Sequence, residues 1–135
     1  MNYNVNDPNF VNSNLYQDFL KNNPAQGYLK IRAYAASGAI PIKGLRVVVS
    51  KNIEDNNVIF FEGIADDSGV IEKIVLPVPK LNESDLTTPN STTYDINTTY
   101  LPDNIINSYQ VNMYENVFVV QTISIVPKMN GMGGL

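Results

Sequence analysis

Residues 27–51 read GYLKIRAYAASGAIPIKGLRVVVSK, and this stretch decides the predicted fold. Apolar and polar side chains alternate over residues 29–35 and again over residues 45–49. Alternation with a period of two is the pattern of a β-strand that buries one face. Two glycines and a proline within residues 38–44 separate the two runs, because these residue types interrupt regular structure. The stretch therefore predicts two β-strands and their connection, with a sandwich built around them.

Five further stretches carry apolar or alternating patterns between turn residues. They are residues 58–65, 70–76, 92–100, 105–114 and 117–126. All eight prolines lie outside the predicted strands. Pro77 and Pro79 are expected to end the strand over residues 70–76, because proline donates no backbone hydrogen bond to a sheet. The pattern predicts an all-β chain, an antiparallel seven-stranded sandwich of the immunoglobulin-like kind.

A short helix is predicted ahead of the sandwich. Residues 1–12 are rich in asparagine and predict an extended arm, and Asn14–Asn22 predicts a helix with Asn14 as its N-cap. One face of this helix is apolar, and its stripe comprises Val11, Leu15, Tyr16, Phe19 and Leu20. The stripe either covers an open end of the sandwich or docks on a neighbouring subunit. The predicted parts are residues 1–26 for the arm and helix, 27–127 for the sandwich and 128–135 for a flexible glycine-rich tail.

Composition excludes several classes of function. The 135 residues carry a net charge of -4 and no cluster of lysine or arginine, which argues against nucleic-acid and membrane partners. The chain has no cysteine and no histidine, so thiolate metal sites and Ser-His-Asp catalysis are excluded. We therefore predict no catalytic, cofactor-binding or metal-binding residue, no cofactor and no enzymatic activity. A hydrolase with two carboxylates across a cleft is an enzyme class that the sequence leaves open.

Four acidic residues lie close together in the sequence around one predicted hairpin. They are Glu62, Asp66, Asp67 and Glu72. Carboxylate oxygens bind calcium, but the alternating ligand pattern and closing glutamate of a calcium loop are absent. Asp66-Asp67-Ser68-Gly69 is instead typical of a tight turn, in which Gly69 supplies a positive φ angle. Turn formation is the favoured interpretation, and a cation site is the alternative.

Five short motifs in order resemble a known family of domains. They are Gly27-Tyr28-Leu29-Lys30-Ile31, residues 39–47 (AIPIKGLRV), Asp66-Asp67-Ser68-Gly69, Leu76-Pro77-Val78-Pro79 and Tyr94-Asp95-Ile96. Together they span about residues 27–126 and resemble carboxypeptidase regulatory-like domains, in particular those found beside spore cortex-lytic enzymes. The chain departs from that pattern after Tyr100, where Leu101-Pro102 replaces Gly-Tyr. The resemblance implies a transthyretin-like sandwich that is non-catalytic.

The expected function is that of a structural subunit of a large assembly. The N-terminus has neither the positive nor the apolar region of a secretory signal, so we expect synthesis in the cytoplasm and release by lysis. A virion of a tailed bacteriophage (tail, neck or baseplate) is the first expectation, and a spore-associated or cell-wall-binding adhesive module is the alternative. The expected partners are protein subunits, including copies of this chain. The expected interface residues are Tyr3, Phe10, Val11, Leu15, Tyr16, Phe19, Met129, Met132 and Leu135. Deleting residues 1–12 or 128–135 is expected to leave a folded domain that no longer assembles.

Overall fold

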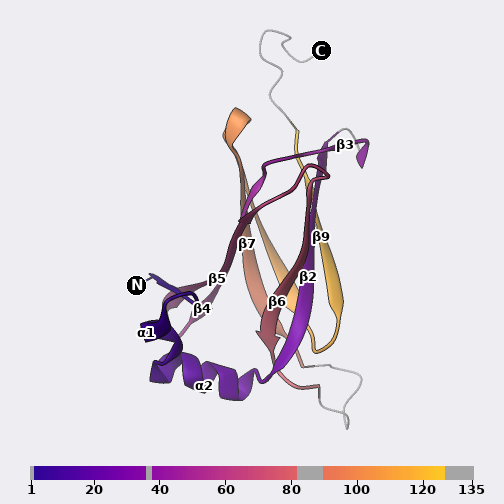
Figure 1. Cartoon of the computed structure of the whole chain (residues 1–135). Helices are drawn as coiled ribbons and strands as arrows, with labels where there is room; N and C mark the ends of the chain where they lie inside the picture. Colours follow the sequence, from indigo (N-terminus) through magenta and orange to yellow (C-terminus); the bar gives the residue numbers. More distant parts are fainter. Residues whose placement is uncertain (1, 36–37, 82–89, 127–135) are drawn as a thin grey trace.

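The chain folds mainly as β-strands arranged in two sheets, with two short α-helices beside them (Figure 1). A computed structural model describes residues 2–35, 38–81 and 90–126. Its elements are β1 (Asn2–Asn4), α1 (Pro8–Val11), α2 (Asn14–Asn22), β2 (Ala25–Ala35), β3 (Ile40–Pro41), β4 (Arg46–Ile53), β5 (Asn56–Ile64), β6 (Val70–Val78), β7 (Thr92–Tyr100), the 3-10 helix η2 (Leu101–Asp103), β8 (Ile105–Met113) and β9 (Phe118–Ser124). The all-β class is confirmed.

The two sheets differ in size. The large sheet has the strand order β1-β5-β4-β7-β8, and the small sheet has the order β3-β2-β6 with β9 also paired to β2. Both β6 and β9 pair with residues 28–32 of β2, so they occupy its two opposite edges. The pairs β2–β9 and β1–β5 are parallel. The prediction of a wholly antiparallel sandwich was therefore wrong, and the described residues add the short strands β1 and β3 to the seven expected.

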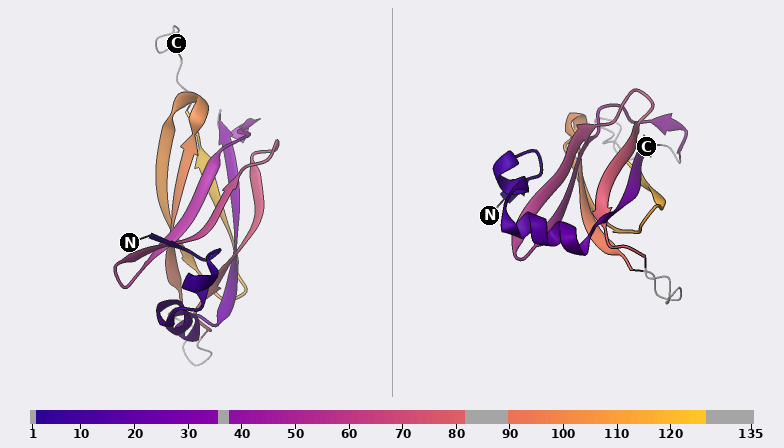
Figure 2. Two further views of the ribbon diagram at one scale, coloured as in Figure 1. Left: turned by 60° about the vertical axis from the view of Figure 1, so that its left-hand side comes forward. Right: turned by 60° about the horizontal axis from the view of Figure 1, so that its bottom comes forward.

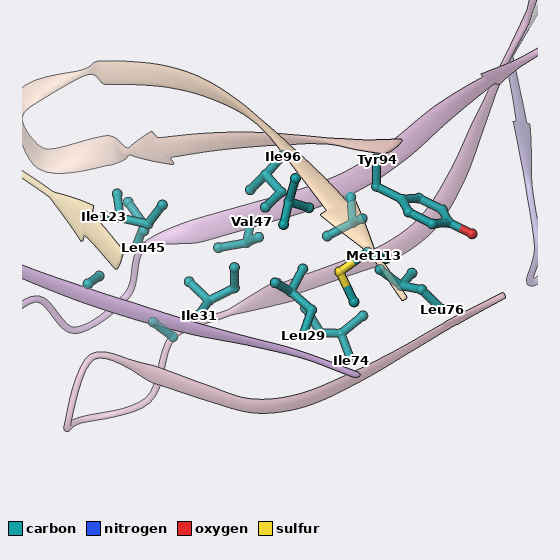
Figure 3. Packing of buried hydrophobic residues seen from close by; sticks show 14 of the residues in the cluster. Leu29, Ile31, Leu45, Val47, Ile74, Leu76, Tyr94, Ile96, Met113 and Ile123 are labelled. Atoms are coloured by element: carbon teal, nitrogen blue, oxygen red, sulfur yellow. The ribbon is translucent and has the colours of Figure 1, made fainter. Parts of the chain in front are cut away.

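The main core lies between the two sheets (Figure 3). Leu29 and Ile31 of β2 are fully buried and face Val47 and Val49 of β4, as the alternation predicts. Tyr94 lies at one end of this aliphatic cluster, and Figure 3 shows its hydroxyl pointing away from the aliphatic side chains. That hydroxyl donates a hydrogen bond to the carbonyl oxygen of Pro77.

A β-bulge changes the predicted alternation in β6. Leu29 pairs with Ile74 and Ile31 pairs with Ile71, so Glu72 and Lys73 both oppose Lys30. Strict alternation would have placed Glu72 on the same face as the buried Ile74. The bulge instead leaves Glu72 and Lys73 exposed on the outer face of the small sheet.

Pro77 lies inside β6, which runs to Val78, so the prediction that this proline ends the strand was wrong. It pairs with Gln26 of β2. Proline is tolerated there because β6 is an edge strand, and the missing N–H can face away from the sheet. Pro41 likewise lies in the short strand β3.

The turn at Asp66–Gly69 forms as predicted. The Asp66 carboxylate accepts hydrogen bonds from the backbone N–H groups of Ser68 and Val70, at 2.9 and 3.0 Å. Gly69 has a φ of 76°, and a Cβ at this position would lie 2.3 Å from the carbonyl oxygen of Ala33. Glycine is therefore required both by the turn and by the close approach of β2.

The N-terminal residues form a second, smaller core. The helix α2 has the predicted bounds, but its N-cap is Ser13, whose Oγ accepts a hydrogen bond from the backbone N–H of Tyr16 at 3.3 Å. Residues 2–11 form β1 and α1 and fold against β5 rather than extending as an arm. The buried members of this second core are Phe10, Tyr16, Phe19, Ile53 and Val58. The interpretation that the helix covers an open end of the sandwich is confirmed, as Figures 1 and 2 show.

Candidate interaction surfaces

The predicted interface residues fall into three groups. Phe10, Tyr16 and Phe19 are 4%, 7% and 8% exposed, so nearly all of their surface stabilises the chain's own second core. Tyr3, Val11 and Leu15 are half-buried at the edge of that core. Met129, Met132 and Leu135 lie outside the described residues. Of the described residues in the prediction, the half-buried group retains the most surface for a contact.

Two shallow hollows flank Leu15 at the N-terminal end of the molecule. One has a volume of about 200 Å³ and is lined by Tyr3, Asp7, Asn9, Phe10, Ser13 and Leu15. The other has a volume of about 150 Å³ and is lined by Leu15, Asp18, Phe19, Asn22, Asn23, Ile53 and Glu54. We call this surface the N-terminal end. Its apolar walls are bordered by three carboxylates, of which Asp18 forms an ion pair with Lys21 at 3.8 Å.

The outer face of the small sheet exposes apolar side chains from three adjacent strands. We call it the aromatic face, and it comprises Tyr28, Val75, Phe118 and Val120. Val75 of β6 and Phe118 of β9 pair with Tyr28 on either side of β2. The rings of Tyr28 and Phe118 stack at 5.1 Å, yet the Phe118 side chain is 57% exposed. Several exposed apolar side chains that adjoin one another on a sheet surface are a feature of contact sites, whereas single ones are common on solvated surfaces.

The aromatic face is bordered mainly by cations. Lys73 lies over the Tyr28 ring with its Nζ 4.9 Å from the ring centroid, and Lys30 forms an ion pair with Glu72 at 3.5 Å. Arg32 follows on β2 and is exposed. The alternation of β2 places all of its polar side chains on this side, the alternation of β6 places Lys73 there, and the bulge in β6 adds Glu72. The face therefore carries three cations and one anion.

A cleft joins the aromatic face to α2. It has a volume of about 350 Å³ and is lined by Val5, Tyr16, Leu20, Asn23, Pro24, Ala25, Gln26, Phe60, Val75 and Pro77. Because Val75 belongs to both surfaces, the cleft extends the aromatic face toward the N-terminal helices. None of the residues that line the cleft carries a charge, so it offers no acid–base pair for catalysis.

The four acidic residues of the predicted hairpin each have a separate partner. Asp66 accepts the turn hydrogen bonds, and the other three form ion pairs with different cations. These ion pairs are Glu62–Arg46 at 3.6 Å, Asp67–Lys43 at 3.3 Å and Glu72–Lys30 at 3.5 Å. In the described part of the chain, no three acidic side chains lie close enough together to hold a metal ion.

The outer face of the large sheet is polar over most of β7 and β8, and Ile106 is its exposed apolar exception on β8. Hydrogen bonds link neighbouring side chains of β7 and β8 in three rungs, Thr93–Asn112 at 2.8 Å, Asn97–Ser108 at 2.7 Å and Asp95–Gln110 at 3.1 Å. A shallow hollow of about 440 Å³ lies over the last two rungs. Such a row of amide, hydroxyl and carboxylate groups offers hydrogen bonds to a polar ligand.

Two ionisable groups near the junction of the cores have altered pKa values. Burial raises the pKa of Tyr94 above the usual range of tyrosine. Burial lowers the pKa of Lys51, and nearby Asp95 opposes that change. The Lys51 ammonium donates to the carbonyl oxygen of Thr93 at 2.8 Å and lies 5.4 Å from the centre of the Tyr94 ring. Both groups have structural partners.

Phe118, Val120, Val75 and Tyr28 were not among the predicted interface residues. A signal was present for β9, because residues 117–120 are apolar at every position. A strand that is apolar on both faces requires a second covered face. The alternation of residues 74–76 places Val75 on the face opposite Ile74 and Leu76, but it does not show that Val75 lies beside Tyr28 and near Phe118.

Comparison with known proteins gives no family assignment. No family model matches the chain, and no curated protein matches its sequence. Among solved structures, a crystal structure of (S)-allantoin synthase is similar, with a TM-score of 0.47 and 11% identity over 81% of this chain. The chain spans 44% of the length of that protein. Within residues 2–35, 38–81 and 90–126, no helix is both long and apolar enough to cross a lipid bilayer.

Proposed function

We propose that the chain is a non-enzymatic structural subunit of a large protein assembly, and that it acts through surface contacts. The observation that carries the proposal is the aromatic face, where Phe118 and Val120 lie two residues apart on β9 and are 57% and 54% exposed. Leaving these side chains in water has a free-energy cost of about 25 cal/mol for each Å² of apolar surface. Covering them with a partner removes that cost.

The assembly that we propose is a tailed-bacteriophage virion, with the chain in its tail, neck or baseplate. A spore layer is the alternative. The domain class in this proposal is transthyretin-like, and the positions of the five motifs support it. They fall on β2, on β3 and β4, in the turn before β6, at the end of β6 and on β7. The partners in this proposal are protein subunits, including further copies of the chain.

Fractionation of the source culture tests the proposal. Density-gradient purification separates virions and spores from soluble protein, and mass spectrometry then measures the chain relative to the most abundant particle proteins. We expect a ratio in virions that stays constant across gradient fractions and after a high-salt wash. The same constant ratio in spores would support the alternative. Recovery of the chain only in the soluble fraction would contradict both.

A second candidate function is favoured by the polar rungs on the large sheet. In that case the chain is a cell-wall-binding or adhesive module, with Asp95, Asn97 and Gln110 as hydrogen-bonding groups toward glycan hydroxyls. Co-sedimentation with purified peptidoglycan tests it. Loss of binding in Asn97→Ala combined with Gln110→Ala, with binding retained in Phe118→Ser, would support this function over the first.

A further inference from the structure

We infer that copies of this chain bind one another head to tail, with the aromatic face of one copy seated on the N-terminal end of the next. This inference rests on the proposed function, because it names the partner of the structural subunit as a second copy. It assigns Phe118 as the projecting side chain and the hollow lined by Tyr3, Asn9 and Leu15 as the site that receives it.

The shapes of the two surfaces are complementary. Phe118 projects from β9 with more than half of its surface exposed, and Val120 and Val75 continue the apolar surface on either side. The hollow of about 200 Å³ at the N-terminal end has aromatic and aliphatic walls. An aromatic side chain that enters an apolar hollow is the usual centre of a stable protein contact.

The charges of the two surfaces are also complementary. The aromatic face carries Lys30, Arg32 and Lys73 against the single anion Glu72. The N-terminal end carries Asp7, Asp18 and Glu54 against the single cation Lys21. Two aromatic faces would repel each other, because each has an excess of two cations. Electrostatics therefore favours the N-terminal end of another copy over a symmetric face-to-face pair.

The positions of the two surfaces determine what the contact builds. Figure 1 and the right view of Figure 2 place α1 and β9 on opposite sides of the molecule. A contact between different surfaces leaves one of each free in every dimer, so further copies add until a ring closes or a filament grows. A contact of this type suits a subunit that is repeated in a tail or baseplate.

A mixing experiment tests the inference with the full chain. Phe118→Ser removes the projecting side chain, and Asn9→Arg fills the hollow from an exposed position without altering a buried residue. We expect the unaltered chain to show a mass that rises with concentration in sedimentation velocity. Each variant alone should associate at least roughly thirtyfold more weakly, because loss of a central contact residue costs two or more kcal/mol.

The mixture distinguishes the head-to-tail contact from a symmetric one. Phe118→Ser retains the hollow and Asn9→Arg retains the aromatic face, so an equal mixture should form a dimer of twice 15.0 kDa and nothing larger. In a symmetric face-to-face contact, Asn9→Arg alone would dimerise. Mixing it with Phe118→Ser would then produce no additional dimer. That result would overturn the inference. Ile106→Ser, at a 68% exposed position on the large sheet, is the matched control and should assemble as the unaltered chain does.

Charge reversal gives an independent test. Lys73→Glu and Asp18→Lys should each weaken association about tenfold, and the double variant should recover most of the loss. Lys43→Glu, which lies elsewhere, is the control. A chain that remains a 15.0 kDa monomer at every concentration overturns the inference. If that monomeric chain is nevertheless recovered at a constant ratio in virions, the proposed function stands and only its partner changes.

Discussion

The two hydrophobic cores of the molecule are built on different principles. The main core is aliphatic apart from Tyr94 and Met113, and it lies between two sheets whose inner faces follow from alternation. The second core is mainly aromatic, with Tyr3, Phe10, Tyr16 and Phe19 following one another in ring contacts of 4.7 to 6.0 Å. The sandwich alone leaves the end of the β4–β5 hairpin uncovered, because alternation buries only the faces between the two sheets. The N-terminal residues supply the missing layer.

Phe60 connects the two cores. It occupies a bulge in β5, because Val49 pairs with Phe61 while Ser50 pairs with Ile59. Its ring meets Tyr94 of the main core edge-on at 5.1 Å, and it lies 5.7 Å from Phe19 of the second core. The second core is small and lies beside the edge strand β1, and we expect it to open separately from the sandwich.

The largest expected change in the free energy of unfolding comes from a substitution in the main core. Leu29→Ala removes a fully buried side chain from the central strand of the small sheet. We expect the free energy of unfolding to fall by about 2–5 kcal/mol, because a cavity adds to the lost transfer energy. Urea denaturation followed by circular dichroism measures this loss. Leu101→Ala, at a 64% exposed position, is the control, and an equal loss there would contradict the assignment of the core.

A smaller effect is expected in the second core, although the side chain removed there is larger. Phe10→Ala should cost about 2 kcal/mol, below the 3–5 kcal/mol of a central phenylalanine, because β1 and α1 can detach while the sandwich stays folded. Limited proteolysis should then cut within residues 2–12 of a chain whose sandwich remains intact. A single cooperative transition, with a loss as large as that of Leu29→Ala, would show that the two cores unfold together. Deletion of residues 1–12 should act in the same direction, since it removes Phe10 and exposes Val58.

At high pH the ionisation of Tyr94, which lies at the junction of the two cores, should lower the stability of the fold. Burial raises the pKa of Tyr94, so above about pH 10 the unfolded chain loses this proton while the folded chain keeps it. The free energy of unfolding should therefore fall by about 1.4 kcal/mol per pH unit above pH 10 from this group alone. The raised pKa values of Tyr16 and Tyr109 act in the same direction.

Tyr94→Phe separates this contribution from the others. Urea denaturation at about pH 10.5 and pH 11.5 measures how the free energy of unfolding changes with pH. In Tyr94→Phe this change should be smaller by the contribution of one proton, about 1.4 kcal/mol per pH unit. Lys51 acts in the opposite direction only below its unfolded pKa, about 10.5, because its folded pKa is lowered. An unchanged slope in Tyr94→Phe would contradict the burial of this hydroxyl in the folded chain.

The smallest expected effect is a gain of stability. The Thr98 hydroxyl is fully buried on the inner face of β7 and has no hydrogen-bond partner within the described residues. Thr98→Val keeps the shape and removes the unsatisfied group, so we expect unfolding to cost about 1 kcal/mol more. Thr99→Val, at the next and half-buried position, should change stability much less. Thermal unfolding of both variants distinguishes the two sites.

The main core could be predicted from sequence because its signals are local. The alternation over residues 29–35 and the glycine at 69 each act within a few residues, and both predictions were confirmed. The parallel pairing of β9 with β2 was not predictable, because it joins segments about ninety residues apart. The bulges at Glu72 and Phe60 depend on neighbouring strands, and they decide which side chains reach the aromatic face and the second core. Ser13 and Asn14 are both good N-caps, so sequence alone did not choose between them.

Hydroxyl-radical footprinting of the full chain tests the contact surfaces most directly, because it measures the solvent access of individual side chains. Dilute and concentrated samples, together with the chain in purified particles, are compared at Phe118, Leu15 and Ile106. The account predicts that Phe118 and Leu15 become protected together in the concentrated sample and in particles, while Ile106 stays reactive. Unchanged reactivity of Phe118 and Leu15 in assembled material, or protection of Ile106 in their place, would contradict it.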